Sequence, residues 1–532
     1  MDARIPRFDT RAEAEEAMEA WTRAGTPLFP LLTTWKEVRD QLLPRIRRAG
    51  PVAAASHERY TPWSPHDKVP PVYENLRVNP DAGLNTIRYM FYHTRCGVWV
   101  SIRKNRVVIF TPFANASYTN TFGPRIRLTA ADLTVEQYSR LKAEVTRRRP
   151  ERLLGDKGSW WLNGGIMCNV MPDNVWGPEY LASIKDMLDE TCARHSVPDC
   201  DFVVNKRDFP QMRREVGREP YARFVHTDVL PREVYSAYVP VFSFYTGTAM
   251  ADLPMPTADD WALAIGKWLP GVSAGPSAAP TPWRATPPAT LAVFRGTGTG
   301  TGITEATNVR LRLVQFSKAR PDLVDAKLVG FNLRDRVVGE DDASGRPGPI
   351  PGPITVDFLK DFDKFGPTVP FMPLVDQAAM FAYVVYVDGH CAASRFGTLL
   401  ASPMVVLRVC SEHADTCGHL WLFDYTKGAR VTDAEAPVLD DADHLLIDPD
   451  LGNMEATVHL LRARPDLAAA IVGRANARAP SVSSITAHWR DLLLCVHHLE
   501  ATCPVAAPPL VPDIEWFSPC DPAYAGIQIS FK

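Results

Sequence analysis

The sequence predicts an α/β protein with two lobes, each built on a parallel sheet. Short apolar runs alternate with helical segments in both halves of the chain. Several of these runs lead through glycine-containing loops into helices, and a proline-rich segment at residues 270–288 separates two halves of comparable size. Strand–helix alternation is typical of parallel sheets covered by helices on both faces, and a proline-rich segment is typical of a hinge.

The first half begins with helices and continues with strands. We expect amphipathic helices at residues 12–26 and 35–49, followed by a proline-punctuated surface loop at 51–71. Residues 86–115 are predicted to form strands around a polar turn at 104–106. Residues 160–170 are left unassigned. The remaining expected elements are helices at 134–148 and 179–195 and short buried strands at 201–205 and 240–245.

The second half alternates more regularly. Strands are expected at 290–294, 381–387, 404–409 and 444–447. Helices are expected at 308–318, 392–401, 453–478 with a break at Pro465, and 480–500. Loops are expected at 295–302 and 344–353, where glycine and proline are frequent.

These elements predict five regions. They are an N-terminal extension (1–75), a first lobe (76–269), a linker (270–289), a second lobe (290–478) and a C-terminal helix and tail (479–532) that returns to the first lobe.

Composition excludes several classes of protein. The 532 residues carry a net charge of -3, so no basic excess indicates nucleic acid as a partner. We find no apolar run long enough to span a membrane and no signal peptide, and we therefore expect a cytoplasmic protein. The ten cysteines include no CxxC pair, so a zinc site is not expected.

A charged loop follows the apolar run DFVVN. It reads Asn205-Lys206-Arg207-Asp208-Phe209-Pro210. Because ligand-binding loops lie at the carboxyl ends of strands in open α/β sheets, Asp208 is a candidate general base for a hydroxyl. The alternative, which the loop sequence by itself favours, is a charged turn that Asp208 caps before proline.

Two further loops are candidates for phosphate binding. Residues 294–302 read FRGTGTGTG, and residues 388–396 read DGHCAASRF. Small residues before a helix let backbone N–H groups approach a phosphate, and the planar guanidinium of Arg395 suits a diphosphate. The alternatives are a flexible turn and a surface arginine. His390 is more often packed than catalytic, and the acidic loop of Asp440, Asp441 and Asp443 is more often solvated than metal-binding.

Taken together and in this order, the motifs resemble glycosyltransferase family 90, which contains capsule-associated and protein O-glucosyltransferases. The resemblance spans roughly residues 179–478. Residues 86–123 resemble the branch of the family found in large DNA viruses. The blocks that carry it are VVNKRDFPQ (203–211), PVFSF (240–244), AVFRGTGTG (292–300), SKARPDLVDA (317–326), YVDGHCAASRF (386–396), LLASPMVVL (399–407) and DHLLIDPDLGNMEATVHLLRARPDLAAAI (443–471).

The resemblance implies a GT-B type fold, with two Rossmann-like lobes and a cleft between them that holds a UDP-sugar. Asp208 matches the catalytic aspartate of the family, and Arg207 and Asp252 are acceptor-lobe candidates. The residues that the resemblance assigns to the donor are Arg295, Gly296, Thr297, Arg310, Ser394, Arg395 and Phe396. The threonine at 297 stands where the family commonly has serine, and the loop is richer in glycine.

The resemblance also implies the reaction. We expect an inverting transferase that moves a hexose or pentose, glucose or xylose before others, from UDP to a hydroxyl of a protein or glycan, with no essential metal and no other cofactor. For a viral member we expect the host cytoplasm or the virion as its location. The alternative is a catalytically inactive relative that binds glycans or belongs to the virion. A nucleotide-binding oxidoreductase is disfavoured, because the GxGxxG fingerprint is missing.

Overall fold

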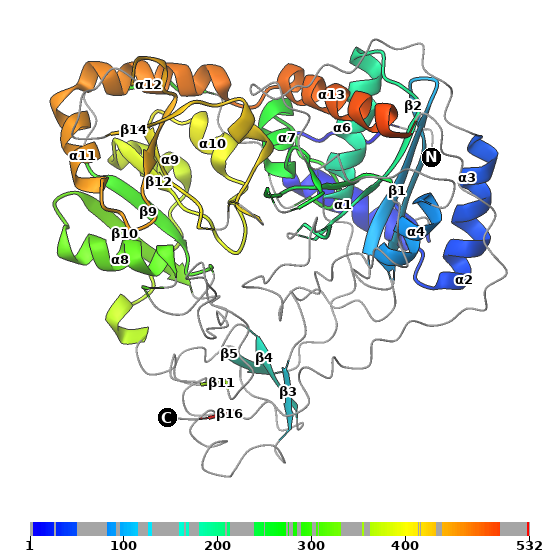
Figure 1. Cartoon of the computed structure of the whole chain (residues 1–532), viewed down its shortest axis with the longest axis horizontal. Helices are drawn as coiled ribbons and strands as arrows, with labels where there is room; N and C mark the ends of the chain where they lie inside the picture. The colour runs from blue at the N-terminus through cyan, green and yellow to red at the C-terminus, as the bar shows by residue number, and fades with distance from the viewer. Residues whose placement is uncertain are drawn as a thin grey trace.

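A computed structural model gives the arrangement of the chain (Figure 1). It describes residues 4–50, 82–114, 180–212, 239–330 and 362–500, and strands at 126–129, 159–163, 166–169, 354–355 and 529–530. The gaps inside these ranges are 26–27, 92–95, 208–209, 249, 273–274, 276–279, 285–288, 301–304, 307, 413, 415–416 and 432–438. The segments expected as loops at 51–71 and 344–353 and as a helix at 134–148 lie outside the described residues.

The second half forms a six-stranded sheet in which every neighbouring pair is parallel. Its order is β10 (Val324–Gly330), β9 (Ala292–Thr297), β12 (Tyr383–Tyr386), β13 (Val405–Val409), β15 (His444–Ile447) and β14 (Gly428–Arg430). The parallel sheet predicted for this half is therefore confirmed. The sequence did not reveal β10 or β14.

Helices cover both faces of this sheet, which explains why its strands are apolar throughout. On one face, Val385 and Leu407 pack with residues of α8 (Val309–Ala319), α11 (Met454–Ala463) and α12 (Pro465–Arg478). On the other face, Val384 and Val406 pack with residues of α10 (Phe396–Leu400). The predicted break at Pro465 is confirmed, since α11 ends before it and α12 begins with it. A further helix, α9 (Leu374–Met380), precedes β12.

The first half forms a five-stranded mixed sheet, so the expectation of a second parallel sheet is wrong. Its order is β2 (Arg106–Ala114), β1 (Cys96–Arg103), β6 (Cys200–Val204), β7 (Val241–Ser243) and β8 (Leu253–Pro254). Lys104 and Asn105, with φ of 50° and 61°, form a two-residue turn that makes β1 and β2 an antiparallel hairpin. β1 is also antiparallel to β6, whereas β6, β7 and β8 are mutually parallel.

Helices surround the five-stranded sheet (Figure 1). Residues 86–89, expected as strand, belong to the helix α4 (Ala82–Tyr89), because apolar side chains three residues apart at Leu84 and Ile87 face the core. Residues 160–170, left unassigned, supply most of β4 (Ser159–Asn163) and all of β5 (Ile166–Asn169). The helices of this part are α1 (Arg11–Arg23), α2 (Trp35–Glu37), the π-helical η1 (Val38–Leu42), α3 (Leu43–Ala49), α4 (Ala82–Tyr89), α6 (Leu181–Arg194), α7 (Ala258–Ile265) and α13 (Val482–Glu500).

Shorter elements complete the description. They are β3 (Ile126–Thr129), β4 (Ser159–Asn163) and β5 (Ile166–Asn169) in one antiparallel sheet, β11 (Ile354–Thr355) beside β16 (Ile529–Ser530), and the 3₁₀ helices η6 (Phe362–Phe365), η7 (Trp421–Asp424) and η8 (Leu439–Asp441). In the segment 270–288, the described residues form neither helix nor strand.

Helices and loops beside the two sheets are in contact. The indole Nε1 of Trp421, in η7, donates to Oδ2 of Asp260 in α7 at 2.8 Å. The backbones of Thr246 and His419 form an antiparallel bridge. The helix α13, which follows the second half of the chain in sequence, places Trp489 against Phe242 of β7, with ring centroids 5.3 Å apart. Among the helices that the structure describes, none has the length and apolar character needed to cross a membrane.

Candidate functional site

The six-stranded sheet has a topological switch point between β9 and β12. The chain leaves β9 through α8 to β10 on one side, and then returns to β12 on the other side of β9. In open α/β sheets, ligands bind outside the carboxyl ends of the strands at such a point. The strand order alone therefore selects the loops after β9 and β12 as a candidate site.

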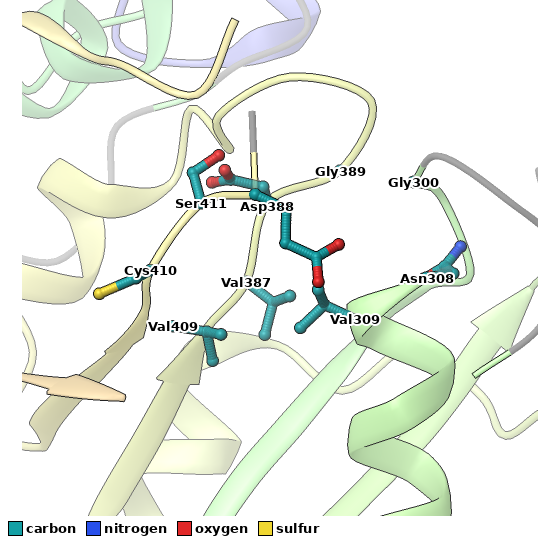
Figure 2. A pocket seen from close by; sticks show the side chains of 10 residues that line it. Gly300, Asn308, Val309, Val387, Asp388, Gly389, Val409, Cys410 and Ser411 are labelled. Atoms are coloured by element: carbon teal, nitrogen blue, oxygen red, sulfur yellow. The ribbon is translucent and has the colours of Figure 1, made fainter. Parts of the chain in front are cut away.

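A pocket lies at this switch point (Figure 2). Its volume is about 20 Å³, enough for one water molecule and too little for a nucleotide, so it would receive only one group of a larger ligand. Its lining residues lie at or just beyond the ends of β9, β12 and β13 and at the start of α8. They are Gly300, Asn308, Val309, Val387, Asp388, Gly389, Val409, Cys410, Ser411 and Glu412.

The start of α8 forms one wall of the pocket. Asn308 is the N-cap of this helix, and its side chain accepts hydrogen bonds from the backbone N–H groups of Arg310 and Leu311 at 3.0 and 3.3 Å. The loop after β9 approaches this cap closely: Gly300 has φ of 139°, and a Cβ there would lie 2.9 Å from the Asn308 amide. Only glycine fits this position, so the glycine-rich sequence serves a close backbone approach.

Arg310 connects the two loops of the switch point. Its Nη1 donates to the carbonyl oxygen of Thr297 at 2.8 Å and to the Thr299 hydroxyl at 2.5 Å. Its Nε and Nη2 donate to the carbonyl oxygens of Asp388 and Val387 at 2.8 and 3.0 Å. The guanidinium is therefore held by the protein itself, on carbonyl dipoles that follow β9 and β12.

Arg395 lies beside the same strands but has fewer partners. Its Nη1 donates to the carbonyl oxygen of Arg295 at 3.0 Å, and its guanidinium lies 5.2 Å from the ring of Phe294. The side chain as a whole is partly exposed, whereas Nε and Nη2 are buried and have no acceptor among the described residues. Burial lowers the pKa of Arg395. Leaving buried N–H donors without acceptors costs free energy. An anion that accepted hydrogen bonds from these two nitrogens would remove that cost.

Arg295 is in a different situation, because its charge is already paired. Its Nη2 lies 2.6 Å from Oδ2 of Asp325, on the neighbouring strand β10, and its Nη1 donates to the Asp325 carbonyl oxygen at 2.7 Å. Although burial opposes the change, the hydrogen bond and the charge of Arg295 lower the pKa of Asp325. Arg295 therefore joins β9 to β10 at the edge of the site.

The other residues assigned to the donor occupy packed positions. Phe396 is fully buried, with ring centroids 5.1 Å from Tyr386 and 4.9 Å from Phe423. Ser394 hydrogen bonds to Asp259 of α7, whose pKa is raised by burial and lowered in part by this bond. A Cβ at Gly296 would lie 2.7 Å from the ring of Phe294, so this position also depends on glycine.

Two charged residues of the site were not singled out from the sequence. Asp388 lines the pocket, and its carboxyl points toward Ser411 (Figure 2). Burial raises its pKa to about 6, while the Ser411 hydroxyl and the charges of Arg408 and Arg310 act in the opposite direction. Arg408 of β13 stacks on Phe423 at 4.0 Å. The Asp-Gly pair that directly follows a buried strand was the available signal for Asp388.

The candidate general base cannot be placed in the same way, because Asp208 lies outside the described residues. On one side of it, Arg207 donates its backbone N–H to Oδ1 of Asn205 at 2.8 Å. Asp252, the other acceptor-lobe candidate, is fully buried next to β8. Burial raises its pKa to about 7, against three hydrogen bonds that favour the carboxylate, from Ser243, Gln211 and Met212.

The acidic loop near residue 440 forms no cluster. Asp443 accepts a hydrogen bond from the backbone of Lys427 and contacts His444 at 2.6 Å, whereas Asp441 is exposed beside the Lys427 amine at 3.3 Å. Within the described ranges, histidine, cysteine and carboxylate side chains gather nowhere in the groups of three that hold a metal ion.

Comparison with known proteins finds a family model that matches part of the chain. The model for Glycosyl transferase family 90 matches residues 180–419. This segment contains the loop of Asp208, the switch point and both candidate donor arginines, Arg310 and Arg395.

Proteins of three large DNA viruses are similar over more of the chain. Uncharacterized protein 035R of Invertebrate iridescent virus 3 is 28% identical over 70% of this chain and 32% of its own length. Uncharacterized protein 179R of Invertebrate iridescent virus 6 is 24% identical over 64% of this chain and 31% of its own. Uncharacterized protein 027R of Frog virus 3 is 30% identical over 63% of this chain and 35% of its own.

The chain spans about a third of the length of these curated relatives. The matched residues 180–419 lie within the segment that carries the predicted resemblance, and the relatives come from large DNA viruses, the branch predicted from residues 86–123. Residues 180–419 are thus similar to glycosyl transferase family 90.

Proposed function

We propose that the chain transfers a sugar, glucose or xylose, from a UDP-sugar to a hydroxyl of a protein or glycan, with inversion and without an essential metal. The match of residues 180–419 to the family model supports glycosyl transfer in general. The choice of donor, the stereochemistry and the acceptor are parts of the proposal.

The observation that carries the proposal is that two nitrogens of Arg395 lack a hydrogen-bond acceptor in the described part of the chain. Its Nε and Nη2 are buried beside a topological switch point and have no acceptor among the described residues. The diphosphate of a UDP-sugar would supply acceptors to both atoms, in charge-assisted hydrogen bonds that are about twice as strong as neutral ones. The N-terminus of α8, at the wall of the pocket, would favour the same negative charge.

The proposed arrangement is of the GT-B type, with two lobes and the donor in the cleft between them. The first lobe (76–269) would contribute Asp208, and the second lobe (290–478) would contribute Arg310 and Arg395. The linker (270–289) and the C-terminal helix and tail (479–532) would connect the lobes. Closure of the lobes would bring the base and the donor together.

The reaction would be a single displacement. The acceptor oxygen attacks the anomeric carbon from the face opposite UDP, and its proton passes to the carboxylate of Asp208. The bond from the anomeric carbon to the β-phosphate oxygen breaks, and its electron pair leaves with UDP. Arginine charge and helix N-termini would then stabilise the diphosphate without a metal.

Release of UDP from a panel of UDP-sugars tests this proposal, with water as the acceptor and EDTA present. We expect release from UDP-glucose or UDP-xylose. A chain that binds UDP but releases none from any sugar nucleotide would support the non-enzymatic alternative. Activity that EDTA removes and Mn²⁺ restores would contradict the metal-free mechanism.

A further inference from the structure

We propose that Asp252 is a positioning residue for the candidate base, acting through a buried chain of hydrogen bonds that fixes the backbone on both sides of residue 208. The inference rests on the proposed function, because it concerns the loop that would supply the base. In this role Asp252 does not contact the substrate.

The bonds run in one direction from donor to acceptor. The backbone N–H of Arg207 donates to Oδ1 of Asn205 at 2.8 Å, and Nδ2 of Asn205 donates to the hydroxyl of Ser243 at 2.9 Å. The Ser243 hydroxyl then donates to Oδ1 of Asp252 at 2.5 Å. The residue before position 208 is thus connected to the carboxylate through two intervening side chains.

The same carboxylate holds the chain beyond position 208. The backbone N–H groups of Gln211 and Met212 donate to Oδ1 and Oδ2 of Asp252 at 2.8 and 2.6 Å. The carbonyl oxygens of these two residues are also bonded, to the Tyr89 hydroxyl at 3.0 Å and to the Ala251 N–H at 2.5 Å. Residues 211 and 212 therefore have little freedom to shift.

The parallel arrangement of β6, β7 and β8 brings these groups together. Asn205 directly follows β6 and donates its N–H to the carbonyl oxygen of Phe242 at 2.8 Å, Ser243 ends β7, and Asp252 directly precedes β8. The side chains of Asn205, Ser243 and Asp252 are completely buried. A buried carboxylate loses stability when its hydrogen-bond donors move away, so the network holds Asn205, Gln211 and Met212 in place relative to one another.

The best test is Ser243→Ala, compared with Ser101→Ala in the full chain. Ser101 lies on β1 of the same sheet, is also fully buried, and accepts one hydrogen bond, from the Trp99 indole at 2.9 Å. Both variants lose a buried hydroxyl, but only Ser243→Ala cuts the connection from Asp252 to Asn205. Asp252→Asn is the second variant: it keeps the shape of the side chain but offers an NH₂ to one of the three donors.

We expect Ser243→Ala and Asp252→Asn to lower kcat for UDP release by about tenfold or more, since small displacements of a catalytic group cost up to about a hundredfold. The KM for the donor should stay within about twofold, because the donor site is elsewhere. Ser101→Ala should lose a similar amount of thermal stability and keep the wild-type kcat.

The outcomes separate the two proposals. If the wild-type chain releases no UDP from any donor, the proposed function fails and this role fails with it. If the wild-type chain is active and Ser243→Ala keeps its kcat, or if Ser101→Ala loses as much, the proposed function stands and the positioning role is overturned.

Discussion

Arg395 donates from Nη1 to the carbonyl oxygen of Arg295 at 3.0 Å, so the arginines of the two candidate donor loops are in direct contact. Their charges are nevertheless balanced differently. Arg295 is paired with Asp325 at 2.6 Å, whereas two nitrogens of Arg395 are buried without an acceptor in the described part of the chain. Replacing Arg395 should therefore mainly affect UDP binding, whereas replacing Arg295 should mainly affect stability.

Arg395→Ala should weaken UDP binding by roughly 1.5–3 kcal/mol, the contribution of a charge-assisted hydrogen bond, with little loss of thermal stability. Arg295→Ala should mainly lower stability, because it removes the hydrogen bonds that join β9 to Asp325 of β10 and leaves the half-buried Asp325 with Lys327 alone as a cationic partner. Calorimetry with UDP and thermal unfolding of both variants separate the two effects. Unchanged UDP affinity in Arg395→Ala would mean that the diphosphate binds elsewhere.

Asp208→Asn should lower transfer by about 10²–10⁴-fold, the usual contribution of a general base. The amide keeps the shape of the side chain and cannot take the proton of the acceptor. UDP affinity and the melting temperature should stay close to wild type, since the donor is bound by other residues. Turnover at the wild-type rate would remove Asp208 from the mechanism.

Arg310→Lys should lose both stability and UDP affinity even though it keeps the charge. The guanidinium bonds to Thr297, Thr299, Val387 and Asp388 at once, and a lysine amine has three donors on a flexible stem. The two loops of the switch point should therefore separate. Thermal unfolding and UDP calorimetry measure the change, with Arg312→Lys, two residues further along α8, as the control. Wild-type values for both quantities would show that charge alone suffices at Arg310.

Asp260 predicts a pH dependence of stability. Burial raises its pKa to about 7 in the folded chain, against hydrogen bonds from Trp421 and Thr257, while the unfolded value is near 3.8. Between these pH values the folded state keeps a proton that the unfolded state releases, so stability falls as pH rises from about 4 to about 7. The full shift corresponds to at most about 4 kcal/mol.

Asp260→Asn should remove this contribution, because the amide stays neutral and its oxygen can still accept from the Trp421 indole. Denaturant unfolding of both proteins at pH 4.5, 6 and 7.5 checks it. The difference in unfolding free energy between variant and wild type should shift in favour of the variant as pH rises. Parallel curves would show that the carboxyl of Asp260 is ionised throughout.

The parts of the fold that the sequence predicts are those that depend on local patterns. Val384 and Val406 lie in continuous apolar runs, which buried parallel strands require, and Asn308 is a strong helix N-cap. The direction of β1 depended on two residues, Lys104 and Asn105, in left-handed conformations. The sequence did predict a polar turn at 104–106, but neither residue is glycine, the usual signal of a tight antiparallel hairpin.

The site was predictable only to the level of its loops. The motifs locate Arg310 and Arg395 near glycine-containing turns, but their partners are set by which strands become neighbours. Arg310 reaches Asp388 across 78 positions of sequence, and Asp252 reaches Gln211 across 41. No local periodicity encodes such pairs, so Asp252 could be matched to a family position while its buried network remained invisible.

The packing of α13 also determines when the first sheet can be completed during synthesis. Trp489 covers Phe242, and Nδ1 of His497 hydrogen bonds to the carbonyl oxygen of Asp199 across 298 positions of sequence. The strands β6 and β7 therefore leave the ribosome long before the helix that covers them. Until residues 482–500 are made, Phe242 lacks the helix that covers it, so the first sheet cannot reach its final packing before most of the chain has been synthesised.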